Sequence, residues 1–260
     1  MRDCGRIEAL LIAALCAPLA APARASDCPG AATIATDRPD VTNSSLVVPT
    51  GSLQLENGVN RLVGTDATTV NLPNSRLRAG LADCLELLAD LPGYSGPTRG
   101  RAPSGVSDLT PAIKRQLPAL PGEFVASAVA GIALPTGDPR IAPRGVNPYL
   151  QVPWSRELVG GWGLSGMVTA FWLPHRDRAE PTVEPTFVIG RQLDAQTELF
   201  VEYVADIVPH ASTGQLINTG GALRLTPTQQ IDIHGGFGIA GDAPRWFIGL
   251  GYSLRLDRVF

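Results

Sequence analysis

The feature that most constrains this chain is the alternation of apolar and polar residues near its end. Between Trp246 and Leu256, every second residue is large and apolar, and most residues between them are small or charged. Successive side chains of a strand point to opposite faces, so this pattern predicts a β-strand with one apolar and one polar face. The same alternation recurs over 196–207 and 230–239.

Segments of this kind occur along the whole chain after residue 51, separated by Gly, Pro, Asp or Asn. They predict about twelve strands, of which Pro73, Pro111 and Pro118 make the early ones the least regular. We therefore predict an all-β fold, a single antiparallel transmembrane β-barrel over 52–260. The predicted strands are 52–63, 69–81, 85–92, 107–117, 122–134, 145–156, 160–173, 181–192, 196–207, 215–225, 229–240 and 245–257.

Two kinds of barrel fit the alternation. A soluble periplasmic barrel that binds a ligand would bury the apolar face, whereas an outer-membrane barrel turns it towards lipid and keeps the polar face in the lumen. The chain ends on an aromatic residue, Phe260, although Asp257-Arg258-Val259 separate it from the alternating strand. Aromatic residues also gather near predicted strand ends, which favours a membrane: Trp154, Trp162, Trp172, Trp246 and Tyr252. We expect outer-membrane lipid and the barrel-assembly machinery as partners.

The amino terminus has the pattern of an export signal. Arg2 and Arg6 precede an apolar run over 9–17, and Ala23-Arg24-Ala25 forms a small-x-small cleavage site. We predict a signal peptide over 1–25, cleaved during export to the bacterial outer membrane. The net charge of −3 offers no basic surface for nucleic acid.

Residues 26–51 are polar and punctuated by Pro and Gly, so they cannot span lipid. They lie either in the periplasm or inside the lumen as a plug. Within them Asp37, Arg38 and Asp40 form a charged group beside Pro39. This group fits a plug or gate that pairs with lumen charges, and it equally fits a rigid periplasmic cap.

Cys28 and Cys84 are the cysteines that remain after the predicted signal peptide. In the oxidising periplasm they can form a disulfide, and two free thiols are the other possibility. Their spacing matches no metal site, and we predict no metal or other cofactor.

If the apolar faces meet lipid, charged residues of both signs enter the lumen. They either line a path for solute or form structural ion pairs with one another. Asp232 and His234 share a strand face, as an acid–His pair of a catalytic site would, but no nucleophilic serine motif accompanies them, so we predict no enzyme. The lumen candidates are Glu56, Arg78, Glu86, Lys114, Glu198, Glu202, Arg224, Asp232, His234 and Arg255.

Several short motifs resemble an outer-membrane transporter family labelled "MetA-pathway of phenol degradation". The motifs are TDRPD at 36–40, VPTG at 48–51 with LQLENG at 53–58, LRAGLADCLE at 77–86, GVSDL at 105–109 and GIALPTGD at 131–138. The resemblance covers about 34–260 and is firmest over 36–140. Cys84 stands where the family usually has a basic residue.

The resemblance implies an outer-membrane barrel with a transport role, and it supplies no ligand or catalytic site. Together with the lumen charges, it leads us to expect a porin-like channel for a small hydrophobic or aromatic solute. A non-conducting structural barrel and a soluble periplasmic ligand-binding barrel are the alternatives.

Overall fold

The structure is a computed structural model that describes residues 28, 31–142, 144–175, 178–209 and 211–260. The predicted signal peptide lies outside these residues. In the described ranges the chain forms β-strands and one 3-10 turn, Val159–Gly161. No helix in them has the length and apolar character needed to cross a membrane.

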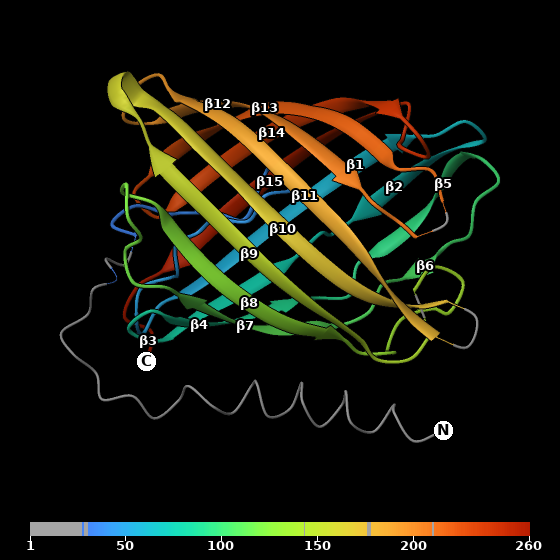
Figure 1. The fold of residues 1–260 in the computed structure, drawn as a ribbon, viewed down its shortest axis with the longest axis horizontal. Helices are drawn as coiled ribbons and strands as arrows, with labels where there is room; N and C mark the ends of the chain where they lie inside the picture. The colour runs from blue at the N-terminus through green and yellow to red at the C-terminus, as the bar shows by residue number, and fades with distance from the viewer. Residues whose placement is uncertain (1–27, 29–30, 143, 176–177, 210) are drawn as a thin grey trace.

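The strands form one antiparallel sheet that closes on itself, because the last strand pairs with the first from Leu53↔Leu256 to Val63↔Trp246 (Figure 1). The strands are β1 (Leu53–Val63), β2 (Ala67–Leu72), β3 (Arg76–Ala82), β4 (Leu85–Asp90), β5 (Tyr94–Gly100), β6 (Gly105–Val106), β7 (Thr110–Gln116), β8 (Val125–Ala133), β9 (Asn147–Glu157), β10 (Trp162–His175), β11 (Arg178–Gln192), β12 (Thr197–Asp206), β13 (Gly214–Thr226), β14 (Gln229–Ala240) and β15 (Trp246–Leu256).

Three neighbouring strands of the barrel are interrupted, so the fifteen segments make twelve barrel strands. The two halves of β1 show this, since Asn60–Val63 pair with β2 and Leu53–Glu56 pair with β3. In the same way β4 continues into β5, and β6 into β7. Pro73 lies in the first break and provides no backbone N–H for the ladder. The predicted barrel of about twelve strands is confirmed.

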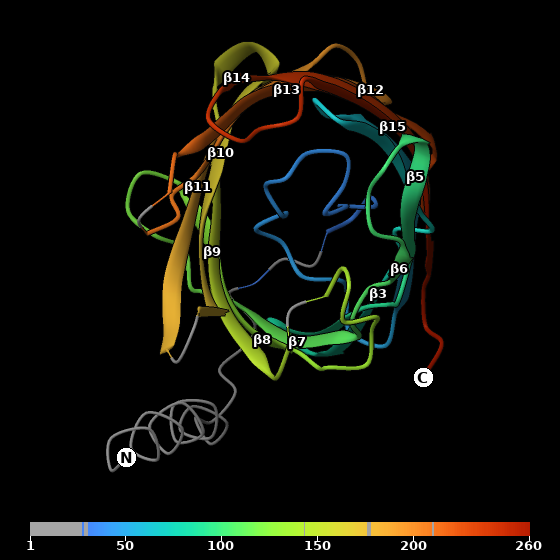
Figure 2. The same ribbon diagram turned by 90° about the vertical axis from the view of Figure 1, so that its right-hand side faces the viewer.

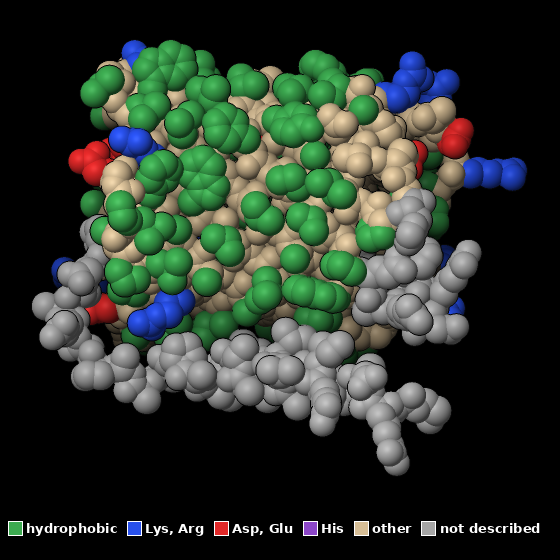
Figure 3. Space-filling model, viewed as in Figure 1, with side chains coloured by type: hydrophobic (Ala, Val, Ile, Leu, Met, Phe, Trp, Pro, Cys, Tyr) green, Lys and Arg blue, Asp and Glu red, His purple; other side chains and the backbone are tan. Residues whose placement is uncertain are grey.

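The apolar face of each strand points outwards. In β15, Leu250 is 53% exposed whereas Ser253 is 0% exposed, and the same contrast recurs around the barrel. Hydrophobic side chains cover the wall seen in Figure 3, and the charged side chains visible there lie towards its two ends. A soluble ligand-binding barrel would have the opposite arrangement. The outward apolar band is what a barrel needs in lipid.

The aromatic residues at the barrel ends also fit a membrane. Trp162 starts β10 at one end of the barrel, and Trp246 starts β15 at the other end. The Arg191 guanidinium lies 5.0 Å from the ring centre of Trp162, and that of Arg61 lies 5.9 Å from the ring centre of Trp246. Such pairs of an aromatic ring and a cation suit the interface between lipid and water.

Candidate functional site

Residues 31–51 run inside the barrel as a plug without strands of its own (Figure 2, blue). Ile34, Val47 and Val48 of the plug are buried. Because the plug forms no ladder, its backbone N–H and C=O groups need partners on the wall.

Wall carboxylates accept hydrogen bonds from the plug's N–H groups. Glu56 of β1 accepts from the Asp37 N–H at 2.9 Å, and Glu202 of β12 accepts from the Thr42 N–H at 2.8 Å. Glu86 of β4 accepts from the Val48 N–H at 2.5 Å. Three points along the plug are therefore held by acids, two from the nearby strands β1 and β4 and one from the distant strand β12.

Wall arginines donate to the plug's carbonyl groups. Arg78 of β3 donates to the carbonyl oxygens of Ala35 at 2.9 Å and Leu46 at 3.0 Å. Arg255 of β15 donates to the carbonyl oxygens of residues 31, 32 and 33. The wall thus provides hydrogen-bond partners for both the N–H and the C=O groups of the plug's main chain.

Three of these wall side chains also belong to an ionic cluster between the plug and the wall. We call this cluster the ionic knot, and its members are Asp37, Glu56, Arg76, Arg78, Glu86 and Lys114. Arg78 lies 2.8 Å from Glu86 and 3.1 Å from Glu56, and Arg76 lies 2.9 Å from Asp37. Burial alone would raise the pKa of Asp37, but the three cations outweigh burial and hold that pKa well below its usual range. Asp37 therefore docks as a carboxylate.

Asp40 lies at the tip of the plug, which is formed by residues 36–43. Its electrostatic environment is opposite to that of Asp37. Burial, then the neighbouring carboxylates Glu202 and Glu198 of β12, raise the pKa of Asp40 well above its usual value. No salt bridge to Asp40 is present among the described residues. The plug is therefore held by charge at Asp37, whereas burial and neighbouring carboxylates disfavour the ionised form of Asp40.

We expect Asp40→Asn to stabilise the docked plug at neutral pH. A carboxyl whose pKa rises on docking favours docking fully below its ordinary pKa, and this contribution is lost as the pH rises through the raised pKa. The unfolding midpoint of the variant, measured against pH in detergent, should exceed that of the wild type at neutral pH and approach it in acid. Asp66→Asn, in an exposed turn, is the control. Parallel pH profiles for wild type and Asp40→Asn would contradict the assignment.

The plug divides the lumen into two hollows. The carboxyl terminus, the start of β1 and short turns such as 83–84 and 227–228 lie at one end of the barrel, and short turns mark the periplasmic end in outer-membrane barrels. The outer hollow, on the other side, has a volume of about 520 Å³ and the inner hollow about 590 Å³. Arg38, Pro39, Asp40 and Asn43 line both hollows, so the tip of the plug separates them.

The linings of the hollows combine polar and apolar side chains. The outer hollow reaches the wall at the interrupted strands, where Pro73, Leu91 and Ser107 line it, and it also has Asn60, Arg76 and Tyr94. The inner hollow is lined by Ser155, Trp162, Phe200, Glu198, Arg224 and Gln230, among others.

The comparisons with known proteins agree with this geometry. The model of the family described as "Putative MetA-pathway of phenol degradation" matches residues 36–256. The chain belongs to this family. No curated protein matches the sequence.

Among solved structures, the chain is similar to the COG4313 outer membrane channel from Pseudomonas putida F1, with 15% identity and a TM-score of 0.67 over 81% of this chain and 97% of that one. It is also similar to the NanC porin, with 9% identity and a TM-score of 0.52 over 78% and 100% of the two chains. The KdgM porin has 8% identity and a TM-score of 0.51 over 77% and 98%. These likenesses support the barrel fold.

The motifs that resemble the family occupy distinct places in the barrel. Residues 36–40 form the first part of the plug tip, and 77–86 form the β3–β4 hairpin. Residues 105–109 span β6 and the break that follows it, and 131–138 contain the end of β8. The family region therefore includes both the plug tip and the irregular part of the wall.

The structure places the ten lumen candidates on inward-facing strand positions. Glu198 and Arg224 line the inner hollow, Glu56 and His234 line the outer hollow, and the others are buried against the plug or the wall. Asp232 and His234 do not contact each other as a catalytic pair would. Asp232 lies 3.3 Å from Arg38, and a His234 ring nitrogen lies 3.2 Å from the Asn60 side-chain oxygen.

Several neutral residues of the site were absent from the sequence-based candidates. The Asn218 side chain donates to Glu202 at 2.9 Å, and that of Gln54 donates to Glu56 at 2.8 Å. The one feature of the sequence that could have identified Asn218 and Gln54 is their position on the polar face of a predicted strand. No group of three or more His, Cys, Asp or Glu able to hold a metal ion occurs in the part of the chain that the structure describes.

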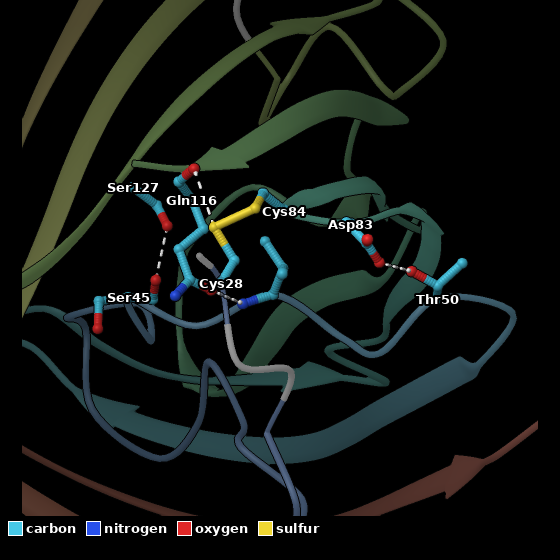
Figure 4. Close-up of a disulfide and its surroundings, with 8 residues drawn as sticks. Cys28, Ser45, Thr50, Asp83, Cys84, Gln116 and Ser127 are labelled. Carbon is cyan, nitrogen blue, oxygen red and sulfur yellow. Dashed lines mark hydrogen bonds between the residues drawn. A yellow bond between two sulfur atoms is a disulfide. The ribbon is translucent and has the colours of Figure 1, made fainter. Parts of the chain in front are cut away.

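A disulfide joins Cys28 to Cys84 (Figure 4). Of the two possibilities considered for the sequence, the structure has the disulfide and not two free thiols. Cys84 lies between β3 and β4, at the periplasmic end. Nearby, the Ser127 hydroxyl donates to the Ser45 carbonyl at 2.6 Å, and the Thr50 hydroxyl donates to Asp83 at 3.2 Å. The plug is therefore attached covalently to the wall as well as by polar contacts.

Proposed function

We propose that this barrel is an outer-membrane channel that passes a small solute from the outer hollow to the inner hollow, past the tip of the plug. The observation that supports this most is the pair of hollows on either side of residues 38–43. The similarity to the COG4313 outer membrane channel and to two porins supports the same class of function.

The linings favour a small hydrophobic or aromatic solute that also carries hydrogen-bonding groups. Tyr94 and Leu91 of the outer hollow, with Phe200 of the inner hollow, offer apolar contact. Asn60 and other amide or hydroxyl groups nearby offer hydrogen bonds. Ligand sites commonly combine apolar lining with a few polar groups that fix orientation.

The proposal assigns no catalysis to the barrel, since Asp232 and His234 have separate partners. It includes export through a signal peptide over 1–25, cleaved after Ala25, and insertion by the barrel-assembly machinery. Amino-terminal sequencing of protein recovered from outer membranes tests the cleavage site.

Replacing residues 36–43 by a Gly-Ser segment of equal length tests the channel proposal. In planar bilayers we expect the wild type to give small conductance steps and the variant to give steps severalfold larger, because the two hollows then join. Liposome swelling with small aromatic solutes should show the same order. Replacement of 101–104, between β5 and β6, is the control, and heat-modifiable gel migration verifies folding of each protein. If neither the folded wild type nor the folded variant passes ions or solutes, the channel proposal is wrong and the protein is a non-conducting structural barrel.

A further inference from the structure

The side chain of Arg38 extends from the tip of the plug to the barrel wall. Its Nη2 atom lies 3.3 Å from Asp232 Oδ1 on β14 and 3.4 Å from the carbonyl oxygen of Leu250 on β15. The side chain is only 14% exposed, and that of Asp232 is 0% exposed. The guanidinium therefore connects the plug tip to a buried acid on the wall.

The wall beneath Arg38 is a cross-strand row of two glycines and an aspartate. Gly58 of β1 lies opposite Gly251 of β15, and Gly251 lies opposite Asp232 of β14. A methyl group on Gly58 would overlap the Arg38 guanidinium, and one on Gly251 would overlap the Asp232 carboxylate and lie 2.6 Å from Arg38 Nε. The two inward glycines leave the space that the guanidinium fills.

The backbone itself does not require glycine at these positions. Neither Gly58 nor Gly251 has a positive φ, so an alanine fits the strand geometry of both. A glycine inside a strand weakens the strand, and it often marks a place where another group approaches the backbone closely. Here the approaching group is the plug's own arginine.

We propose that Gly58 and Gly251 are positioning residues that form a seat for Arg38, and that this seat holds the plug tip in place between the two hollows. The inference rests on the proposed channel function and identifies the contact that keeps the path narrow. Arg38 lines both hollows, so its position decides how far they are separated. If the guanidinium left the seat, Asp232 would stay buried without its cation. The free-energy cost of that buried charge opposes the release of Arg38 from the seat.

A double-mutant cycle of Gly58→Ala and Arg38→Ala tests the seat. The overlapping atoms at Gly58 belong to the free end of a flexible side chain, so the alanine displaces the guanidinium and spares the barrel. Gly214→Ala is the matched control, because the nearest atom to its added methyl group lies 3.7 Å away. Two quantities are measured for each folded protein: the thermal unfolding midpoint in detergent and the single-channel conductance.

We expect Gly58→Ala and Arg38→Ala each to lower the midpoint and to raise the conductance severalfold. The double variant should differ little from Arg38→Ala, because the alanine at 58 has nothing left to displace. Additive effects, or a Gly58→Ala protein that matches the Gly214→Ala control in both measurements, would overturn the seat. Non-additive midpoints in proteins that never conduct would establish the seat and refute the channel function.

Discussion

Arg78→Ala is expected to lower the free energy of unfolding by about 3–5 kcal/mol, the usual cost of removing one partner from a buried ion pair. Arg78 is fully buried and contacts Glu86 and Glu56, and it also donates to the carbonyl oxygens of Ala35 and Leu46. Its loss leaves two buried carboxylates short of a cation and the Leu46 carbonyl group without its side-chain donor, whereas the Ala35 carbonyl group keeps Gln54 as a donor. The effect should therefore exceed that of any single change at the plug tip.

Equilibrium urea unfolding in lipid vesicles, followed by tryptophan fluorescence, measures this effect. Arg115→Ala is the control, since Arg115 lies on β7, two strands away from Arg78, but is exposed. Arg78→Lys should recover only part of the loss, because an ammonium group cannot make the paired contacts of a guanidinium. If Arg78→Ala unfolds with the same free energy as Arg115→Ala, the ionic knot does not stabilise the protein.

Removal of the disulfide is expected to have an effect of similar size. Cys28 and Cys84 are 56 residues apart in sequence, and closing a loop of this length stabilises a fold by about 4 kcal/mol in the chain-entropy description. The loop contains the plug as well as the first barrel strands. Its release should therefore weaken the docking of the plug and the closure of the barrel together.

The double variant Cys28→Ser, Cys84→Ser is compared with the wild type in the same unfolding assay, with and without a reducing agent. Reduction should bring the wild type close to the double variant and leave the variant unchanged. Each single variant should match the double variant, because either change removes the bond. A wild type that unfolds identically in both conditions would show that the disulfide adds no stability.

The strands could be predicted because their pattern is local. One face of Trp246–Leu256 is apolar along its whole length, and the requirement for an apolar outer surface in lipid makes that pattern regular. Pro73 also marked the irregular region of the wall. That three neighbouring strands break side by side was not predictable, since it depends on how separate segments pair.

The plug was harder to predict for a physical reason. Its N–H and C=O groups bind side chains from distant strands, and such contacts impose no periodic pattern on residues 31–51. The same limit applies to Asp232 and His234. Their shared face was visible in the alternation, but their partners Arg38 and Asn60 are set by the three-dimensional packing.

The distribution of the plug's wall contacts has a consequence for the order of assembly. The groups that hold its backbone come from strands along the whole barrel sequence: β1, β3, β4, β7, β8, β12 and β15. Arg255, which binds the first described residues of the plug, belongs to β15, which follows the other described strands in sequence. The complete binding surface thus exists only after β15 has joined β1. The plug precedes the barrel strands in sequence but is the last part of the fold to reach its final contacts.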